Sequence, residues 1–347
     1  MKKLRIKDIA DGLKISKTAV SFILNGKAEE KRISEELVER VEKYIQEVGY
    51  RPSPIARGLR TGKSHIIALM VESISDPFFA TIARLIENEA YKEGYRIIYC
   101  STDNDTEKTK ELINVMKDRN VDGYIISPPP GVEKEVNELI RAGMPVVMFD
   151  RYLPKVKTDY VVIDNEPSAE NATKYLIKQG YSNIGMITFS SSLTQMKGRL
   201  KGYRNALKEE GLKPYVLEID FTPEEKVMVQ TVRDFLVANP KLDAILFGAI
   251  QAGSCGLKAM TQLKLKVPED LAVISFDDHD IFELFATPVT AIAQPIEKIA
   301  HKVIGLLLDR LDAEKVSAEP REVVLKTKMK VRGSSVVKNS KKYLESK

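Results

Sequence analysis

The sequence predicts a small three-helix unit at the amino terminus, followed by a larger α/β body with two lobes. Apolar residues recur at helical spacing over the first 49 positions, whereas short apolar runs alternate with amphipathic stretches from residue 65 onward. The excess of basic residues is confined to the amino-terminal part. A chain of 347 residues is also long for one domain, since domains average roughly 150 residues.

Charge is divided unevenly along the chain. Residues 1–63 hold 15 Lys or Arg and 9 Asp or Glu, whereas the remainder holds 39 basic and 40 acidic residues. A basic module attached to a near-neutral body is the electrostatic pattern of a phosphate-binding unit, so we expect it to bind nucleic acid. A solvated helical face is the alternative that charge alone leaves open.

Three short helices are expected in the first 49 residues. The first covers residues 6–13, and the second follows Ser16, which is placed as an N-cap, and ends at residues 25–26. The third begins at Ser34 and stops at Gly49. The first two, joined by a short connector, are typical of a helix-turn-helix, although the pattern also fits a generic helical bundle.

The short apolar runs of the body are predicted as strands of parallel sheets, because amphipathic stretches of about 10 to 16 residues separate them. The predicted strands cover residues 65–71, 96–100, 123–127, 145–149, 161–163, 184–189, 244–247 and 272–276. Two pairs of segments are weakly similar to each other, 120–126 to 241–247 and 146–150 to 273–277, which predicts two lobes. The expected lobes cover 65–163, with a return of the chain over 292–325, and 164–291.

Side chains that directly follow these strands are candidate ligand contacts. In open α/β sheets, ligands bind beyond the carboxyl ends of the strands, and between two lobes those ends face one cleft. The candidates are Asp76, Phe78, Phe79, Ser127, Asp150, Phe189, Gln251 and Asp277. Core packing is the alternative for each phenylalanine.

Features of secreted or membrane proteins are missing from the sequence. Residues 1–5 lead into a charged amphipathic segment instead of an apolar signal region, and no run of about 18 apolar residues occurs. We therefore expect a cytoplasmic chain with no membrane association. Cys100 and Cys255 lie far apart, without a CxxC motif or a nearby histidine cluster, so we expect buried thiols and no metal site.

Residues with catalytic chemistry are sparse. His65, His279 and His301 show no HExxH spacing, and residues 252–256 lack the first glycine of a nucleophile elbow. Residues 58–64 have three residues between glycines where a P-loop needs four, and no strand precedes them. His279, among three aspartates, is either an acid–base group or part of a polar loop. We expect neither enzymatic activity nor a cofactor.

Four segments near the amino terminus carry a family resemblance. They are 6–10 (IKDIA), 15–21 (ISKTAVS), 24–26 (LNG) and 50–59 (YRPSPIARGL). The chain resembles the lactose-repressor and galactose-repressor (LacI/GalR) family of transcription regulators over nearly its whole length. The resemblance implies a helix-turn-helix headpiece over 1–49, a hinge over 50–64 and a two-lobed body like a type I periplasmic binding protein, with doubly wound parallel sheets.

By this resemblance the protein is a repressor that binds a pseudo-palindromic double-stranded DNA operator as a homodimer. The second helix enters the major groove with Lys17, Thr18 and Phe22 at base edges. Leu59 matches a wedge that the paired hinges push into the minor groove, and a flexible basic linker is the alternative. The expected DNA contacts are Lys7, Ser16, Lys17, Thr18, Ser21, Phe22, Asn25, Tyr50, Pro52, Ala56, Arg57 and Leu59.

The resemblance also implies a small-molecule effector, sugar-like, in the cleft. Arg199 matches the family's effector-contacting arginine and so joins the strand-end candidates; a structural ion pair is its alternative role. A sugar would stack on aromatic rings and exchange hydrogen bonds with aspartate and arginine. Effector binding would close the lobes and change the pairing of the hinges. Whether the effector releases DNA or promotes its binding stays open.

Three residues depart from the family pattern. Lys14 stands where the family usually has glycine at a tight turn, and a left-handed non-glycine residue costs about 1 to 2 kcal/mol, so we expect a local difference. Phe22 stands where arginine is common; it offers only apolar contact, such as with a thymine methyl, unless it is a core aromatic. Gln251 places a neutral amide where an ionised effector contact is usual, which implies an unusual effector or none.

Two other functions stay open at this point. A solute-binding receptor would share the two-lobed body and lack the DNA role, and an enzyme would need the missing catalytic residues. Residues 336–347 form a basic, polar tail without a leucine heptad, so a dimer is the default assembly and tail disorder is expected.

Overall fold

The computed structural model describes residues 4–24, 26–50, 63–220, 224–312 and 319–338. The chain divides into two compact units, Met1–His65 and Ile66–Lys347. The division falls where the basic headpiece gives way to the α/β body.

The first unit contains the three expected helices, α1 (Ile6–Leu13), α2 (Lys17–Leu24) and α3 (Glu35–Val48). Ser34 caps α3, since its side chain accepts a hydrogen bond from the backbone N–H of Leu37, and Gly49 ends it in the left-handed conformation. Among the described residues of this unit, the predicted positions of the three helices are therefore confirmed.

The turn between α1 and α2 keeps a left-handed residue despite the absence of glycine. Lys14 ends α1 with φ 53° and ψ 44°, and the backbone N–H of Ile15 donates to the carbonyl of Ala10 at 3.0 Å. Arg40 of α3 donates to the carbonyl of Leu13 at 2.9 Å and so satisfies an otherwise open end of α1. The expected local difference at Lys14 is not found; the turn holds its geometry at a conformational cost.

Apolar side chains from all three helices form the core of the first unit, which consists of Ile9, Ala10, Val20, Ile23 and Val41. The helices approach closely, because a Cβ built on Gly12 would lie only 2.2 Å from the hydroxyl oxygen of Tyr44. A small unit of this kind depends on such close contacts, since it has little apolar surface to bury.

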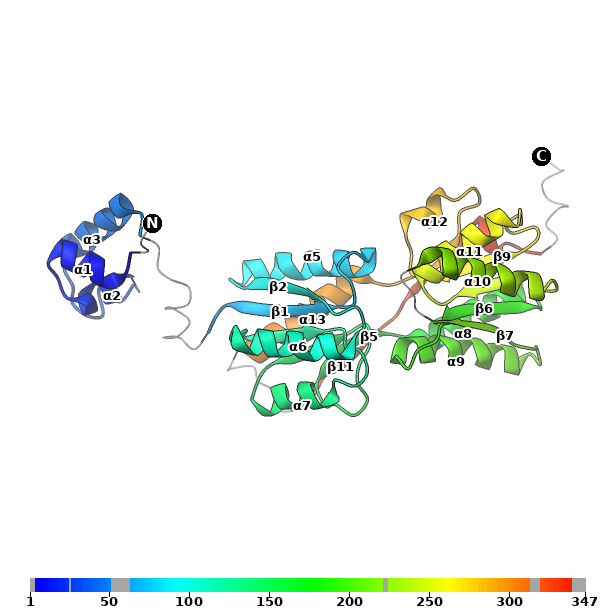
Figure 1. Ribbon diagram of the computed structural model, residues 1–347, viewed down its shortest axis with the longest axis horizontal. Helices are drawn as coiled ribbons and strands as arrows, with labels where there is room; N and C mark the ends of the chain where they lie inside the picture. The colour runs from blue at the N-terminus through cyan, green and yellow to red at the C-terminus, as the bar shows by residue number, and fades with distance from the viewer. Residues whose placement is uncertain (1–3, 25, 51–62, 221–223, 313–318, 339–347) are drawn as a thin grey trace. The chain divides into compact units, whose positions relative to one another are not determined.

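The second unit contains two six-stranded sheets, one in each lobe (Figure 1). The first sheet has the spatial order β2 (Arg96–Ser101), β1 (Ile66–Val71), β3 (Gly123–Ile126), β4 (Val146–Phe149), β5 (Asp159–Ile163) and β11 (Glu322–Leu325). The second has the order β7 (Tyr215–Ile219), β6 (Ile184–Phe189), β8 (Ala244–Phe247), β9 (Ala272–Phe276), β10 (Thr290–Ala293) and β12 (Lys328–Lys330).

Helices cover both faces of each sheet. On the first sheet, α5 (Pro77–Lys92) and α13 (Ile296–Leu311) share one hydrophobic core, while α6 (Thr106–Asp118) and α7 (Glu133–Arg141) share the other. On the second sheet, α8 (Asn165–Lys178) and α9 (Thr194–Glu209) cover one face, and α10 (Glu225–Ala238) and α11 (Ile250–Gln262) cover the other. The short α12 (Asp280–Leu284) follows β9. Both sheets are therefore doubly wound, as the sequence predicts.

The internal similarity of the sequence corresponds to equivalent places in the two sheets. The similar segments 120–126 and 241–247 lead into β3 and β8, the third strand of each sheet, and the segments 146–150 and 273–277 contain β4 and β9, the fourth. Each sheet reverses its strand order between its second and third strands, which places a topological switch point at the carboxyl ends of β1, β3, β6 and β8.

Four strands escape sequence prediction: β7, β10, β11 and β12. β11 and β12 are short and partly exposed edge strands, so no continuous apolar run marks them. The last of them also breaks the expected parallel pattern, because β12 runs antiparallel to β10. Only two residues separate β11 from β12, although the two strands belong to different sheets.

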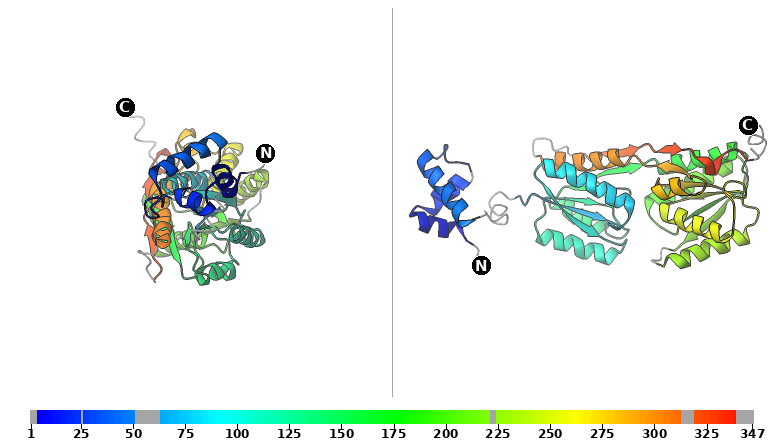
Figure 2. Two further views of the ribbon diagram at one scale, coloured as in Figure 1. Left: turned by 90° about the vertical axis from the view of Figure 1, so that its left-hand side faces the viewer. Right: turned by 90° about the horizontal axis from the view of Figure 1, so that it is seen from above.

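The chain passes between the two sheets three times: after β5, after β10 and after β11. Figure 2 shows the red carboxyl-terminal segment passing from the first lobe to the second. The third passage is absent from the sequence prediction. It brings a 3-10 helix, Gly333–Ser335, against the second lobe, where the Ser334 hydroxyl donates to the carbonyl of Val273 at 2.7 Å.

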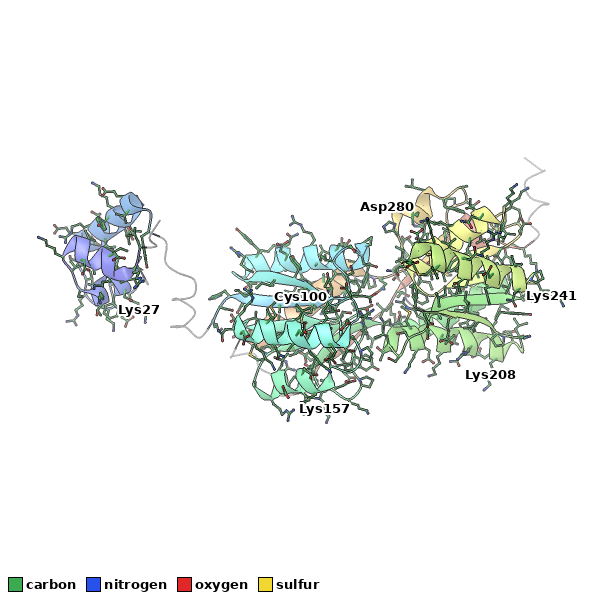
Figure 3. All side chains as sticks on the ribbon, viewed as in Figure 1. Lys27, Cys100, Lys157, Lys208, Lys241 and Asp280 are labelled. Carbon is green, nitrogen blue, oxygen red and sulfur yellow. The ribbon has the colours of Figure 1, made fainter. Side chains whose placement is uncertain are left out.

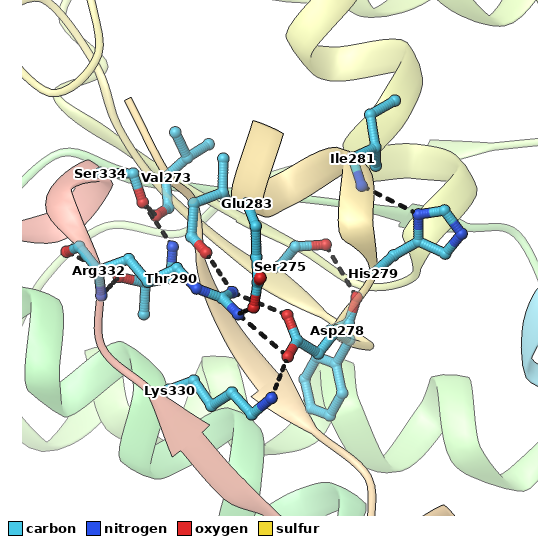
Figure 4. Close-up of polar contacts among 12 residues, drawn as sticks. Val273, Ser275, Asp278, His279, Ile281, Glu283, Thr290, Lys330, Arg332 and Ser334 are labelled. Atoms are coloured by element: carbon cyan, nitrogen blue, oxygen red, sulfur yellow. Dashed lines mark hydrogen bonds and ion pairs between the residues drawn. The ribbon is translucent and has the colours of Figure 1, made fainter. Parts of the chain in front are cut away.

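A charged cluster holds the segment that follows β11 against the second lobe (Figure 4). Arg332 donates to both carboxylate oxygens of Asp278, at 2.7 and 3.1 Å, and Lys330 lies 2.7 Å from the same carboxylate. The next residues also contact the body, since the hydroxyl of Tyr181 donates to the carbonyl of Val336 at 2.8 Å. The described beginning of the expected tail is therefore ordered against the second lobe, and residues 339–347 lie outside the described part.

The interior of the body is mostly apolar, and the charged side chains buried in it are Arg151, Asp159 and Arg199. Cys100 and Cys255 are free and buried, as expected. Figure 3 shows Cys100 within the first lobe and Lys157, Lys208 and Lys241 on the outside. Among the described residues, no helix has the length and hydrophobicity needed to cross a membrane.

A buried ion cluster joins α13, β5 and β11. Asp159 is 1% exposed and accepts from Arg310 at 2.7 and 3.0 Å and from the Arg321 side chain at 3.0 Å. Burial opposes ionisation of this carboxyl, but the hydrogen bonds from the two arginines outweigh it and hold its pKa below the usual range. The cluster fixes the returning helix and strand to the first sheet.

We expect Asp159→Asn to destabilise the body by about 3 kcal/mol, because it leaves two partly buried guanidinium groups without their buried carboxylate. Urea unfolding followed by circular dichroism measures the change. The matched control is Asp118→Asn on the exposed end of α6, which should stay within about 0.5 kcal/mol of the parent. A loss at Asp159 as small as that of the control would contradict this role.

Candidate functional site

The amino-terminal end of α2 presents a polar surface. Ser16, Lys17 and Thr18 are exposed there, as is Lys7 on α1. The Ser16 hydroxyl accepts a hydrogen bond from the backbone N–H of Ala19 at 3.0 Å, so this residue is a helix cap. The capping role is compatible with a phosphate contact, because a helix amino terminus also attracts an anion.

Phe22 lies beside this surface and not in the core. It is absent from the buried core of the first unit and from the partly buried side chains packed against it. The ring is half-buried, as is Ser21, and Lys31 Nζ lies 5.7 Å from its centroid. The core-aromatic alternative is therefore not supported, and Phe22 remains available for apolar contact with a base.

Tyr50 differs from the other expected DNA contacts, because it packs against the core of the first unit. Burial raises the pKa of its phenol group. The remaining expected contacts, Asn25, Pro52, Ala56, Arg57 and Leu59, lie outside the described residues.

Charge is also divided between the helices of the first unit. α3 carries five glutamates and two basic residues, whereas residues 4–24, which contain α1 and α2, carry four basic and two acidic residues. A polyanion is attracted to the first two helices and repelled by the third. The arrangement favours one orientation of the unit on a nucleic acid.

A cavity of about 100 Å³ lies between the two lobes, at the carboxyl ends of the strands. All but one of the expected effector contacts line it, namely Asp76, Phe78, Phe79, Asp150, Phe189, Arg199, Gln251 and Asp277. Ser127, the exception, lies directly beneath, where its hydroxyl accepts from Arg151 Nε at 2.9 Å. The topology thus gathers residues that lie up to 201 positions apart in the sequence.

The phenylalanines of the cavity combine lining with core packing. Phe79 and Phe189 are 6% and 8% exposed and belong to the hydrophobic cores. Phe78 is only half-buried, and its ring meets Phe79 edge to face at 5.1 Å between centroids. Phe78 is therefore the aromatic side chain with most surface available to a ligand.

Arg151 is a buried cation beneath the first lobe's side of the cavity. It is 1% exposed, and Nη2 donates to Glu72 Oε2 at 2.9 Å. Its Nε lies 3.6 Å from the carboxylate of Asp150. Among the described residues, its Nη1 has no hydrogen-bond partner although it is buried. This nitrogen is an unpaired buried donor on a residue that lines the cavity.

Arg199 has an equivalent place in the second lobe. It is 2% exposed, donates to Asn165 Oδ1 at 2.8 Å and to the carbonyl of Gly248 at 2.7 Å, and lies 4.2 Å from the ring centroid of Phe276. Asp277 is 3.9 Å away. Arg199 therefore makes the contacts expected of its structural role, and it also lines the cavity.

Asp150 and Asp277 take equivalent positions after β4 and β9, each with a positive φ, 66° and 64°. Asp is one of the few side chains that tolerates this conformation. Burial raises the pKa of Asp150 to about 6, and the nearby charges of Arg151 and Arg199 lower it only in part. Burial likewise raises the pKa of Asp76.

Two glutamines of the second lobe hold these first-lobe aspartates. Gln251 Nε2 donates to Asp76 Oδ2 at 2.5 Å, and Gln195 Nε2 donates to Asp150 Oδ2 at 3.2 Å. Asp76 also caps α5, since it accepts from the backbone N–H of Phe78 at 2.8 Å. The departure at Gln251 therefore produces a direct hydrogen bond between the lobes.

The residues considered for catalysis, Ser254 and His279, have structural roles in the fold. Ser254 lies inside α11, so residues 252–256 are not a turn that exposes a nucleophile. His279 Nδ1 accepts from the backbone N–H of Ile281 at 3.2 Å and caps α12 (Figure 4). The polar-loop interpretation of His279 agrees with this contact.

Comparison with known proteins identifies the family. Residues 5–53 match the bacterial regulatory proteins of the lacI family, and residues 173–335 match the periplasmic binding protein-like domain. The transcriptional repressor CytR of Escherichia coli (strain K12) is 33% identical over 340 residues, which are 95% of this chain and 96% of that protein. The chain belongs to the lacI family of bacterial regulatory proteins.

The chain is also similar to other transcription regulators. The ribose operon repressor of Halalkalibacterium halodurans is 29% identical over 92% of this chain and 94% of its own. The solved complex of the transcriptional regulator CelR with cellobiose is 26% identical, has a TM-score of 0.69 and covers 95% of this chain and 99% of that one. The regulator CcpA of Lactococcus lactis, 24% identical with a TM-score of 0.70 over 78% of this chain and 98% of its own, has the same fold.

The protein is thus a DNA-binding transcription regulator, and the solute-receptor alternative loses its support. Both the headpiece and the body match regulators over almost the whole chain. These relatives are named as regulators and not as enzymes, which fits a protein without catalytic activity.

The sequence prediction omits six polar residues that line the cleft: Glu72, Asn104, Ser190, Ser191, Gln195 and Gln294. Asn104 lies in the loop after β2, Gln195 lies in the first turn of α9, and Gln294 follows the unpredicted β10. Arg151 is also missing from the predicted contacts, although it directly follows the predicted Asp150. The sequence does not show whether a polar side chain of this kind points into the cleft or into solvent.

We expect ionisation of Asp150 to lower the stability of the body. An unfolded aspartate has a pKa of about 3.9, so between about pH 4 and 6 the folded carboxyl keeps a proton that the unfolded one has released. The free energy of unfolding should therefore fall through this window as the pH rises, relative to Asp150→Asn. Urea unfolding of both proteins from about pH 4 to 7 measures the difference. Parallel curves would contradict the raised pKa.

Proposed function

We propose that the protein is a repressor that binds a pseudo-palindromic operator as a homodimer. Two identical headpieces related by a two-fold axis require symmetric half-sites. The relatives of Halalkalibacterium and Escherichia are both named repressors, which supports repression. On the body, α12 exposes Leu284 to 84% and Ile281 to 39%, and these apolar side chains suit a contact between two copies.

The major-groove contacts of this proposal come from α2. Lys17 and Thr18 are exposed at its start, and Phe22 lies one turn further on. Lys7, Ser16 and Ser21 contact the sugar–phosphate backbone, together with Asn25 and Tyr50. The hinge, with Pro52, Ala56, Arg57 and the minor-groove wedge Leu59, contributes the remaining contacts.

The proposed input is a sugar-like effector in the cleft between the lobes. A buried donor on Arg151, carboxylates on Asp150 and Asp277 and the half-buried ring of Phe78 suit a ring that carries hydroxyl groups. The ribose operon repressor and the CelR complex with cellobiose bear names of sugars, which supports this class. The single observation behind the proposal is a cleft of polar strand-end residues attached to a lacI-type headpiece.

A genome-wide pull-down with the full chain should enrich an inverted repeat, bound by two copies of the protein. A chain that starts at Ser64 should lose this binding, because it lacks the basic headpiece. Fluorescence anisotropy on the enriched sequence measures both affinities. Enrichment without an inverted repeat, or equal affinity of the shortened chain, would refute the proposal.

The side chain at residue 22 should determine the preferred base at one pair of symmetry-related operator positions. Phe22→Arg is expected to shift preference at those positions toward guanine, by roughly 1 to 3 kcal/mol, because arginine binds guanine in a bidentate manner. Selection of random operators by both proteins measures the change. Lys7→Ala serves as the control and should weaken all sequences alike while lowering the salt dependence. An unchanged base preference of Phe22→Arg would place this side chain away from the bases.

A further inference from the structure

The charges that line the cleft point to the class of effector, an inference that rests on the proposed effector role of the cleft. Four acidic side chains line the cavity, Glu72, Asp76, Asp150 and Asp277, against two arginines. The lining therefore carries an excess of negative charge. A ligand meets this charge at short range, because the side chains lie at or beneath the cavity wall.

The two arginines are already committed to acids of their own lobes. Arg151 donates to Glu72 at 2.9 Å, and Arg199 lies 3.9 Å from Asp277. Asp76 instead accepts from the neutral amide of Gln251, and Asp150 accepts from that of Gln195. Arg151 Nε lies 3.6 Å from Asp150 but directs its hydrogen bond to Ser127. Among the described residues, no cation is hydrogen-bonded to Asp76 or Asp150.

Unsatisfied atoms of the cleft show what a ligand must supply. Gln195 Oε1 and Asn104 Oδ1 are buried acceptors, and Arg151 Nη1 is a buried donor; none has a partner among the described residues. Two of these three atoms are acceptors, and the carboxylates of the aspartates are further acceptors. A ligand that satisfies them must donate several hydrogen bonds and accept at least one.

We propose that the cleft selects a hydroxyl-rich ligand without negative charge, and that Asp76 and Asp150 exclude phosphorylated or carboxylated sugars. Hydroxyl groups donate to Gln195, Asn104 and the aspartates, and a hydroxyl oxygen accepts from Arg151 Nη1. A phosphate can only accept, and it would lie among four carboxylates that face only two arginines. Like charges brought together in this way weaken binding by at least about a hundredfold.

Matched pairs of ligands test this inference on the full chain at pH 7.5. Ribose and ribose 5-phosphate, glucose and glucose 6-phosphate, and glucose and gluconate are compared by thermal shift and isothermal calorimetry. At least one neutral sugar should bind, and its anionic partner should bind at least about a hundredfold more weakly. An anionic member that binds as tightly as its neutral partner overturns this inference but not the sugar-effector proposal. Failure of every compound to bind overturns the sugar-effector proposal with it.

The double variant Asp76→Asn, Asp150→Asn identifies the residues responsible. Asparagine still caps a helix and tolerates a positive φ, so both replacements suit their backbone positions. The preference for the neutral member of a pair should shrink at least tenfold. Glu111→Gln, an exposed position on α6, is the matched loss of charge and should leave the preference unchanged. An unchanged preference in the double variant overturns the assignment.

Discussion

Burial of a guanidinium group beneath the strand ends is the constraint on which the effector body depends. Parallel strands bring their carboxyl ends, and the polar residues that follow them, to one edge of a sheet. Arg151 meets three of these strand ends, because it contacts Glu72 after β1, Ser127 after β3 and Asp150 after β4. Removal of its charge would leave Glu72 without a compensating partner in a poorly solvated site.

The second lobe repeats this solution with different residues. Arg199 comes from helix α9 and not from a strand end, yet it reaches the carbonyl of Gly248 after β8 and lies near Asp277 after β9. The equivalence of Asp150 and Asp277, each in the left-handed conformation, shows how closely the two lobes correspond. Symmetric lobes with facing polar edges form a binding cleft without any special loop.

The connections between the lobes determine how a ligand can act. Three chain passages join the sheets, and the hydrogen bonds from Gln251 and Gln195 join the cleft walls directly. A ligand that favours one lobe arrangement changes the population of that arrangement. The hydrogen bond from Gln251 to Asp76 joins the lobes without a ligand, so a ligand that moves the lobes must compete with a contact that already exists.

The sequence by itself determined the local structure and the family. Caps at Ser16, Ser34 and Gly49, together with helical spacing, placed the three headpiece helices, because these signals act within a few residues. Continuous apolar runs placed the buried strands, and strand ends gave seven of the residues that line the cleft. Only the tertiary structure decided the antiparallel β12, the third passage, and the inward direction of Gln195 and Asn104. These features depend on contacts between residues far apart in the chain, and the energy of such contacts leaves no pattern in a local stretch of sequence.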